Sequence, residues 1–306
     1  MEYHARWSSP SGALAAPPAA RLTGLAGSRL PGISIRLALL MITGLFVWPA
    51  FAHAFEVWST TQEFSYGFLV PPISVLLVWW RWREVGKTAG RGAWMGLPIV
   101  VGAVALALFG HRAAINAIIG LAVIPLLWGM AIFLWGWSAA RILAFPIGFL
   151  AFGLGLYRGL LGSVGFALQE VTAAGAGTLG AGLGLPVVRD GLVLRGERFA
   201  FIVAEACSGM GSLLSLLALA ALWIYLAGGS WRARLAVLLS VAPLVIVANI
   251  TRVTLVLVVA SWFGAEAALG FFHGASSLVL FGIALAGLLL VSWVAGCKTP
   301  RFAISS

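Results

Sequence analysis

The sequence predicts an all-α polytopic membrane protein, with about eight transmembrane helices and a small extracytoplasmic hairpin before the sixth. Three observations lead to this fold class. Of the 306 residues, 61% are hydrophobic and only 9% are charged, and the mean hydropathy is +1.04. Most of the 14 Trp residues lie near the ends of apolar runs, as in the aromatic belts of membrane proteins. The basic residues form short clusters between these runs, so the net charge of +10 indicates membrane topology and contact with the lipid bilayer, not nucleic acid binding.

The first segment, residues 1–32, is rich in Pro, Ala and Gly and carries several Arg. This composition is typical of a disordered tail, and the Arg residues favour a cytoplasmic location. The apolar run that follows is long and lies far from the start, which fits a retained signal anchor better than a cleaved signal peptide. We therefore expect a membrane domain at residues 33–296 and a second short cytoplasmic tail at residues 297–306.

Each apolar run was compared with the length needed to cross the membrane. A helix takes about 20 residues to cross about 30 Å of hydrocarbon. The predicted spans are residues 33–55, 66–82, 94–109, 113–134, 142–156, 207–226, 235–262 and 269–294.

The basic clusters predict the orientation. If both termini are cytoplasmic, the Lys and Arg residues at 81–91, 141, 232–234 and 298–301 all fall on the cytoplasmic side. The Gly- and Ala-rich segment 159–185 is either another span or an amphipathic piece in the outer interface. A single extra span would put the 232–234 cluster outside, so we favour the interfacial or re-entrant alternative.

The segment 186–203 differs from the apolar runs. Two runs of β-branched and apolar residues flank turn-forming Gly, which predicts a hairpin. This hairpin would deliver the chain to Cys207 at the outer surface.

Cys207 begins the sixth predicted span and is one of two cysteines in the chain. An isolated Cys in a membrane helix is more often a packing residue, but the neighbours of Cys207 favour a nucleophile. Glu205 is an acidic residue just before the predicted helix, and Ser208 and Gly209 form a turn of small residues. The N-terminus of a helix stabilises the thiolate form of a cysteine. Cys297 lies at the far end of the last span, so no disulfide is expected.

Two further residues are expected near Cys207. Arg252 lies within the seventh predicted span, where burying a guanidinium costs at least about 3 kcal/mol unless it faces a polar cavity and a partner. Asn249, on the same helical face, could orient the guanidinium or share its ligand. His273 starts the last span, where a lone His is more often a satisfied polar residue than a catalyst. The topology nevertheless brings Cys207, Arg252 and His273 to the outer halves of three successive helices.

The ordinary pKa values of Cys, His and Arg side chains suggest a different role for each in such a site. Imidazole titrates near neutrality and can accept the thiol proton, whereas guanidinium stays charged and only donates hydrogen bonds. We predict Cys207 as nucleophile, His273 as acid and base, and Arg252 as the group that stabilises the thiolate or an oxyanion. The intermediate would be an acyl-thioester. No metal or other cofactor is expected, since one outer Cys and one His do not make a ligand set and no phosphate-binding motif occurs.

At these residues the sequence resembles the exosortase/archaeosortase family of membrane enzymes. The matching pieces lie in order along the chain, and the similarity covers most of residues 35–296. They are residues 63–72, 79–83, 185–191, 205–209, 249–253 and His273. The resemblance implies a cysteine transpeptidase-like peptidase, whose catalytic Cys, Arg and His correspond to Cys207, Arg252 and His273.

The resemblance also implies partners and a location. The substrates would be exported proteins with a C-terminal sorting signal, which consists of a short motif, often Pro-Glu-Pro, a transmembrane helix and a basic tail. Cleavage would occur at the outer face of a bacterial inner membrane, with transfer to an acceptor linked to exopolysaccharide as a further outcome. Departures from the family pattern leave the subfamily and its recognition motif open. They lie at Tyr66, residues 151–157, residues 210–212 and Ser277.

Two other classes of function fit parts of the sequence. In a polytopic transporter or polysaccharide-export component, Arg252 would bind an anionic substrate and Cys207 would only pack. The chain lacks the inverted repeat and the matching broken helices that a secondary transporter leads one to expect. In a membrane scaffold, neither residue would matter beyond folding.

Overall fold

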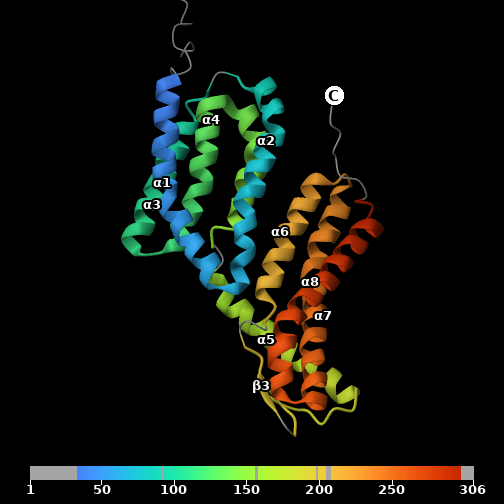
Figure 1. Cartoon of the computed structure of the whole chain (residues 1–306). Helices are drawn as coiled ribbons and strands as arrows, with labels where there is room; N and C mark the ends of the chain where they lie inside the picture. The colour runs from blue at the N-terminus through green and yellow to red at the C-terminus, as the bar shows by residue number, and fades with distance from the viewer. Residues whose placement is uncertain (1–32, 91, 156–157, 198, 205–207, 298–306) are drawn as a thin grey trace, which may run out of the picture.

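The computed structural model describes residues 33–90, 92–155, 158–197, 199–204 and 208–297. The predicted tail at 1–32 and residues 298–306 of the second tail lie outside these ranges. Most of the described chain is helical, and two helical bundles make up its bulk (Figure 1).

The first bundle contains α1 (Ile33–Thr60), the 3-10 helix η1 (Gln62–Leu69), α2 (Val70–Thr88), α3 (Gly96–Ala113) and α4 (Asn116–Phe149). The 3-10 helix η2 (Leu150–Phe152) and α5 (Arg158–Gly182) lead out of it to the strands β1 (Val188–Asp190), β2 (Val193–Arg195) and β3 (Ala200–Ile202). The second bundle contains α6 (Met210–Leu226), α7 (Trp231–Phe263) and α8 (Ala265–Ala295).

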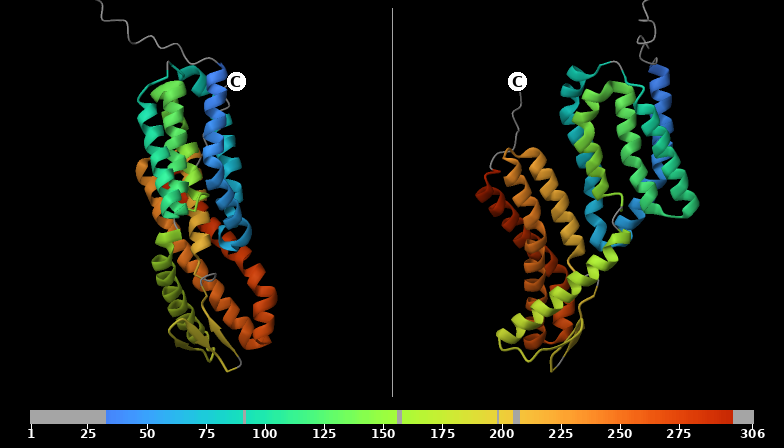
Figure 2. Two further views of the ribbon diagram at one scale, coloured as in Figure 1. Left: turned by 90° about the vertical axis from the view of Figure 1, so that its left-hand side faces the viewer. Right: turned by 180° about the vertical axis from the view of Figure 1, so that it is seen from behind.

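The two bundles lie side by side but are displaced along their long axes (Figures 1 and 2). The start of α1, the end of α2, the start of α7 and the end of α8 all point to one end of the molecule. The sheet and the turn between α7 and α8 lie at the opposite end, beyond the ends of α3 and α4. This arrangement agrees with the expectation that the basic clusters share one side; which side is cytoplasmic stays a prediction.

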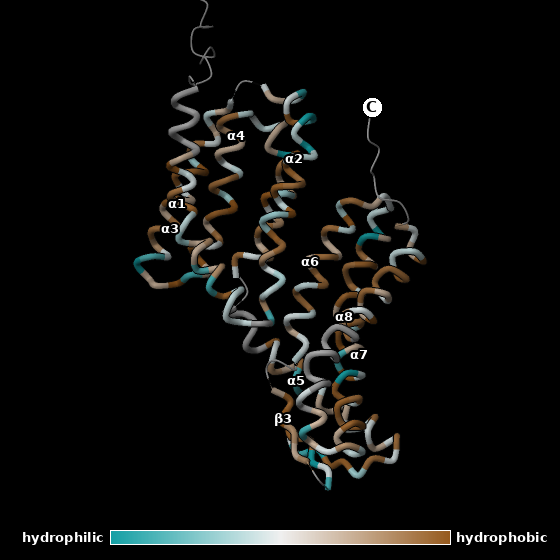
Figure 3. The backbone as a smooth tube through the Cα atoms, in the orientation of Figure 1, coloured by the Kyte–Doolittle hydropathy of each residue, from teal (hydrophilic) through white to brown (hydrophobic). Residues whose placement is uncertain are grey.

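Four helical stretches within the described ranges are long and apolar enough to span a membrane, namely residues 63–88, 96–113, 116–152 and 231–263. Met210–Leu226 and Leu280–Ala295 are shorter apolar helices. Hydrophobic residues run along the helices of both bundles (Figure 3), and many large side chains point outward, including Leu45, Trp79 and Leu239. Such exposure suits contact with lipid. The protein is therefore a multi-pass α-helical membrane protein, and the number of spans stays a prediction.

Most of two predicted spans, residues 113–134 and 142–156, belongs to α4. The backbone at Gly136 is not helical, with φ 84° and ψ 175°, and it divides α4 into two arms. Glycine adopts such a conformation without the clash of a Cβ atom. The indole Nε1 of Trp128 donates to the carbonyl of Ala140 at 3.0 Å, which joins the two arms across the break. The predicted interruption between residues 134 and 142 therefore lies at Gly136.

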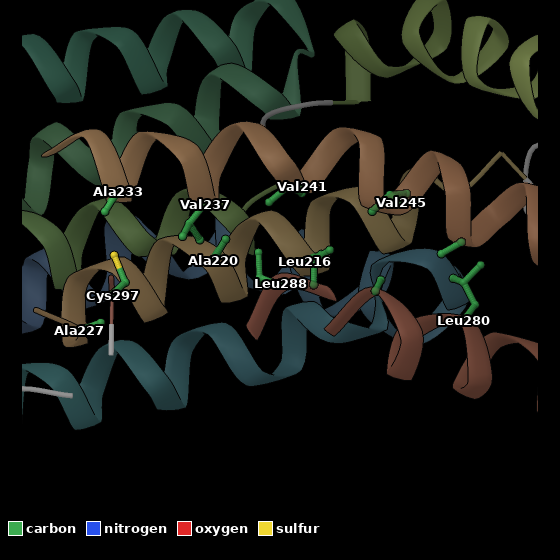
Figure 4. Close-up of a cluster of buried hydrophobic side chains, with 12 residues drawn as sticks. Leu216, Ala220, Ala227, Ala233, Val237, Val241, Val245, Leu280, Leu288 and Cys297 are labelled. Carbon is green, nitrogen blue, oxygen red and sulfur yellow. The ribbon is translucent and has the colours of Figure 1, made fainter. Parts of the chain in front are cut away.

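The helix α6 lies between the two bundles and contributes to the core of both. Leu216 and Ala220, one turn apart, are fully buried against α7 and α8 (Figure 4). Ala218 and Leu222 lie about 200° around the helix from this pair, at 100° per residue. They belong to a second cluster, which contains residues of α1, α2 and both arms of α4. The apolar composition of both faces explains why this helix shows no amphipathic stripe.

The segment predicted as a hairpin forms three short antiparallel strands in the order β1-β2-β3. The turn between β1 and β2 contains Gly191 at φ 59°, which fits the predicted turn chemistry. The sequence pattern predicted two strands, and the structure adds a third strand and a second pairing. Leu194 of β2 is fully buried in a cluster with residues of α5, the last third of α7 and the first turn of α8, which anchors the sheet to these helices.

Candidate active site

The helix α6 starts directly after the Cys207 segment. Its first residue is Met210, three residues later than the predicted start of the span at Cys207. The Ser208 hydroxyl is buried and accepts a hydrogen bond from the Met210 amide at 3.1 Å. Gly209 has φ 82°, a left-handed conformation that other residues adopt only with strain. Ser208 and Gly209 thus build the predicted turn, whereas Glu205 and Cys207 lie outside the described residues.

A fully buried Asn249 on α7 contacts this turn. A Cβ atom placed on Gly209 would lie 3.2 Å from Cγ of Asn249, so the turn rests against the amide group. The Asn249 Nδ2 group donates to the Thr172 hydroxyl on α5 at 2.9 Å. Asn249 therefore connects α5, α7 and the chain that follows Cys207.

Close packing of α5 on α7 makes the Asn249–Thr172 hydrogen bond possible. A Cβ atom on Gly175, one turn after Thr172, would lie only 2.5 Å from Cδ1 of Ile250. A larger residue at position 175 would push the helices apart. Small residues at helix contacts are a common way to bring membrane helices together.

Arg252 lies one turn after Asn249 and is 8% exposed. It lines a cavity of about 330 Å³ together with residues of β2, β3, α7 and α8. At 1.5 Å per residue, Arg252 lies about 32 Å along α7 from Trp231. It lies about 17 Å from the end of α7 at Phe263, inside the stretch that is apolar and long enough to span a membrane. The depth of the guanidinium in the membrane stays a prediction.

His273 lies in α8, which runs antiparallel to α7 after the turn at Gly264 (Figure 1). By helical rise, Arg252 lies about 18 Å from Gly264 and His273 about 14 Å from it. The two backbone positions are therefore at the same level within one turn. The side chain of His273 lies outside the described residues.

The 3-10 helix η1 approaches the start of α6 from the first bundle. A Cβ atom on Gly211 would lie 2.7 Å from the carbonyl oxygen of Glu63, so backbone meets backbone here. The indole Nε1 of Trp58 donates to the Gly153 carbonyl at 2.9 Å, and the Tyr66 hydroxyl donates to the Phe152 carbonyl at 3.2 Å. The Tyr66 bond joins η1 to η2, and the Trp58 bond joins the end of α1 to the residue after η2. The contact between Glu63 and Gly211 places η1 beside the start of α6.

A family model for the transmembrane exosortases matches residues 58–290. The chain belongs to this family. No curated protein and no solved structure matches the chain. Family membership makes this exosortase a membrane protein-sorting enzyme of the transpeptidase type. The matched range includes the whole region from η1 through Asn249, Arg252 and the α8 position of His273.

The structure of the exosortase brings together part of the predicted site. Ser208, Gly209 and Asn249 are in one cluster, and Arg252 is one helical turn away. Sequence reasoning gave no role to Thr172, which is 1% exposed. The position of Thr172, a polar residue within the Gly- and Ala-rich helix α5, is the feature of the sequence that could have pointed to its role.

The arrangement suits chemistry on a charged sulfur or oxygen atom. Arg252 offers a planar set of donors beside an apolar cavity, where hydrogen bonds to an anion are stronger than in water. Across the described part of the exosortase, no cluster of three or more His, Cys, Asp or Glu residues could hold a metal ion. The absence of a metal from the reaction stays a prediction.

Proposed function

We propose that this exosortase is a cysteine peptidase or transpeptidase that removes C-terminal sorting signals from exported proteins at the outer face of a bacterial inner membrane. Cys207 is the nucleophile, His273 the acid and base, and Arg252 the donor to the thiolate or oxyanion. One observation carries the proposal. The buried Asn249 holds the turn directly after Cys207 against α7, one helical turn from Arg252.

The reaction has two steps. The Cys207 thiolate attacks the carbonyl carbon of the scissile peptide bond, and Arg252 stabilises the resulting oxyanion. The carbon–nitrogen bond then breaks, His273 gives its proton to the leaving amine, and an acyl-thioester forms. Water or an acceptor amine attacks the thioester, His273 takes the proton of this nucleophile, and the Cys207 thiolate is released.

The orientation follows from charge. The described basic residues at 81–87 and 232–234 lie at the end of the bundles opposite the sheet. Basic loops favour the cytoplasm, so the sheet and the start of α6 face outward. A substrate that has crossed the membrane except for its anchoring helix would present its signal at this end.

The test is co-expression with an exported reporter that carries a C-terminal motif, a transmembrane helix and a basic tail. We expect the tail to be lost with the parental enzyme and retained with Cys207→Ala. A transporter in which Arg252 binds an anion would be insensitive to Cys207→Ala. Processing of the reporter by the alanine variant at the parental rate would therefore rule out the proposed nucleophile.

A further inference from the structure

The strand β3 is an edge strand. Within the described ranges it pairs with β2 alone, and β1 closes the other side of β2. Phe201 lies opposite Leu194, and the ladder is extended by hydrogen bonds from the Gly196 amide to the Phe199 carbonyl and from the Val203 amide to the Leu192 carbonyl.

This register fixes the direction of each backbone group. In an antiparallel pair, residues that exchange hydrogen bonds with the partner alternate with residues that do not. Phe199, Phe201 and Val203 point their amide and carbonyl groups toward β2. Ala200 and Ile202 therefore present theirs on the open side of β3, where an added strand would pair.

The residues on the open side of β3 are accessible and border the cavity that contains Arg252. Ala200 and Ile202 are exposed, Ile202 to 65%, and residues 200–204 all line the cavity. Its remaining lining residues are apolar side chains of β2, α7 and α8, apart from Arg252. Within the part of the chain described here, Arg252 is the one charged group in this lining.

The open strand also leads to the proposed nucleophile. Cys207 follows Ile202 by five positions in the sequence. A peptide paired with β3 would thus be bound by the same stretch of chain that carries the thiol.

We propose that β3 binds the protein substrate by strand addition. An extended segment of the substrate pairs with the open edge at Ala200 and Ile202 and places its side chains in the cavity beside Arg252. The segment is apolar and not basic, because the described walls of the cavity are apolar apart from the guanidinium of Arg252. This inference takes the substrate from the proposed function and adds how that substrate is held.

Cross-linking tests the pairing without any need for turnover. Single cysteines at Ala200 or Ile202, in an enzyme with both native cysteines replaced by Ala, are combined with single cysteines along the reporter's signal. Strand addition predicts one fixed register: moving the enzyme cysteine from 200 to 202 shifts the cross-linked reporter position by two residues. The control is a cysteine at Arg189, exposed on the opposite edge strand, which should not cross-link.

A second variant tests the backbone directly. Ile202→Pro removes an outward amide and no bond to β2, whereas Ile202→Ala keeps that amide. We expect Ile202→Pro to process the reporter about fivefold to tenfold more slowly than Ile202→Ala, the loss expected for one backbone hydrogen bond. Lysine in the paired segment of the reporter should also slow processing.

Each outcome is decisive. Cross-links without a register, or equal rates for the proline and alanine variants, would overturn strand addition while leaving the peptidase intact. Cross-links between cysteines of two enzyme copies would make β3 a self-association edge and would also overturn it. Failure of the parental enzyme to process the reporter would count against the proposed function, whereas the register measured in the enzyme lacking Cys207 would still report on β3.

Discussion

Thr172 and Asn249 are among the most buried polar side chains of the described residues, at 1% and 0% exposure. Their hydrogen bond joins two helices whose positions in the sequence differ by 77 residues. Bonds between membrane helices contribute about 0.6 kcal/mol on average and up to about 1.7 kcal/mol. The pair is thus a modest source of stability, and its main effect is to place the Asn249 amide against Gly209.

Replacing Asn249 by Ala should therefore reduce activity more than stability. We expect the melting temperature to fall slightly and reporter processing to fall about tenfold or more, because the turn after Cys207 loses its support. Thr172→Val is the matched variant, similar in volume and without the acceptor. In a double-mutant cycle of thermal unfolding, the pair should couple by about 0.5 to 1.7 kcal/mol. Additive effects would show that the hydrogen bond does not contribute.

Substitutions of the charged and titrating residues test the chemistry itself. Arg252→Lys should not restore activity, because a point charge does not reproduce a planar fork of donors. His273→Ala should lower the rate constant for processing about a hundredfold or more. The measurement is the rate of tail loss at equal amounts of membrane-inserted enzyme. A lysine variant at the parental rate would remove Arg252 from oxyanion or thiolate stabilisation, and a loss below about threefold would remove His273 from the mechanism.

At the scale of elements, the start of α6 is the most constrained junction. Gly211 contacts Glu63 of the first bundle here, and Gly209 contacts Asn249 of α7. The contact at Gly211 leaves no room for a side chain, and at Gly209 the left-handed backbone and a tight contact with Asn249 disfavour one, so the path of the chain at the N-terminus of α6 is set by two glycines. This end of α6 also carries the partial positive charge that favours a nearby thiolate.

Gly209→Ala tests this junction. The alanine would cost about 1 to 2 kcal/mol in the left-handed conformation and would press its Cβ on Asn249. We expect lower stability and a larger loss of processing. Gly148→Ala in α4 is the control, since nothing lies within 4 Å of its Cβ, and alanine there should be neutral or slightly stabilising. If both variants behave alike, the conformation of Gly209 does not matter to the site.

At the scale of the whole molecule, α6 joins the two bundles at both of its ends. Near its last turn, the Tyr225 ring stacks on Phe145 of α4 at 3.9 Å between centroids. The Tyr225 hydroxyl accepts from Nε of Arg81 on α2 at 2.9 Å. Together with the Glu63 contact at the first turn, this cluster couples the first bundle to the site.

Two substitutions at Tyr225 separate the contributions of this cluster. Tyr225→Phe keeps the stacking and removes one hydrogen bond, which should lower the unfolding free energy by about 1 kcal/mol. Tyr225→Ala also removes the aromatic pair and should lose at least about 1 kcal/mol more. Thermal unfolding in detergent measures both. Equal melting temperatures for the two variants would mean that the ring stacking does not hold the bundles together.

Much of the fold could be predicted because transmembrane helices are local in sequence. The apolar runs, the break at Gly136 and the shared end of the basic clusters all follow from patterns within about 20 residues. The third strand was missed because all three strands are only three residues long, which leaves too little alternation to count them from the sequence. The site was predicted only in part: Ser208 and Gly209 stood out beside Cys207, whereas the pairing of Asn249 with Thr172 depends on the close approach of α5 and α7, which no local pattern encodes.

The burial of Cys297 simplifies thiol chemistry on this protein. Its side chain is 1% exposed, and a Cβ atom on Gly229 would lie 2.7 Å from its sulfur, so backbone covers the thiol. The chain has two cysteines in all. Any labelling of the folded enzyme by a membrane-impermeant maleimide is therefore expected at Cys207. The reactivity of the proposed nucleophile, and its protection by a bound peptide, become measurable in the unsubstituted protein.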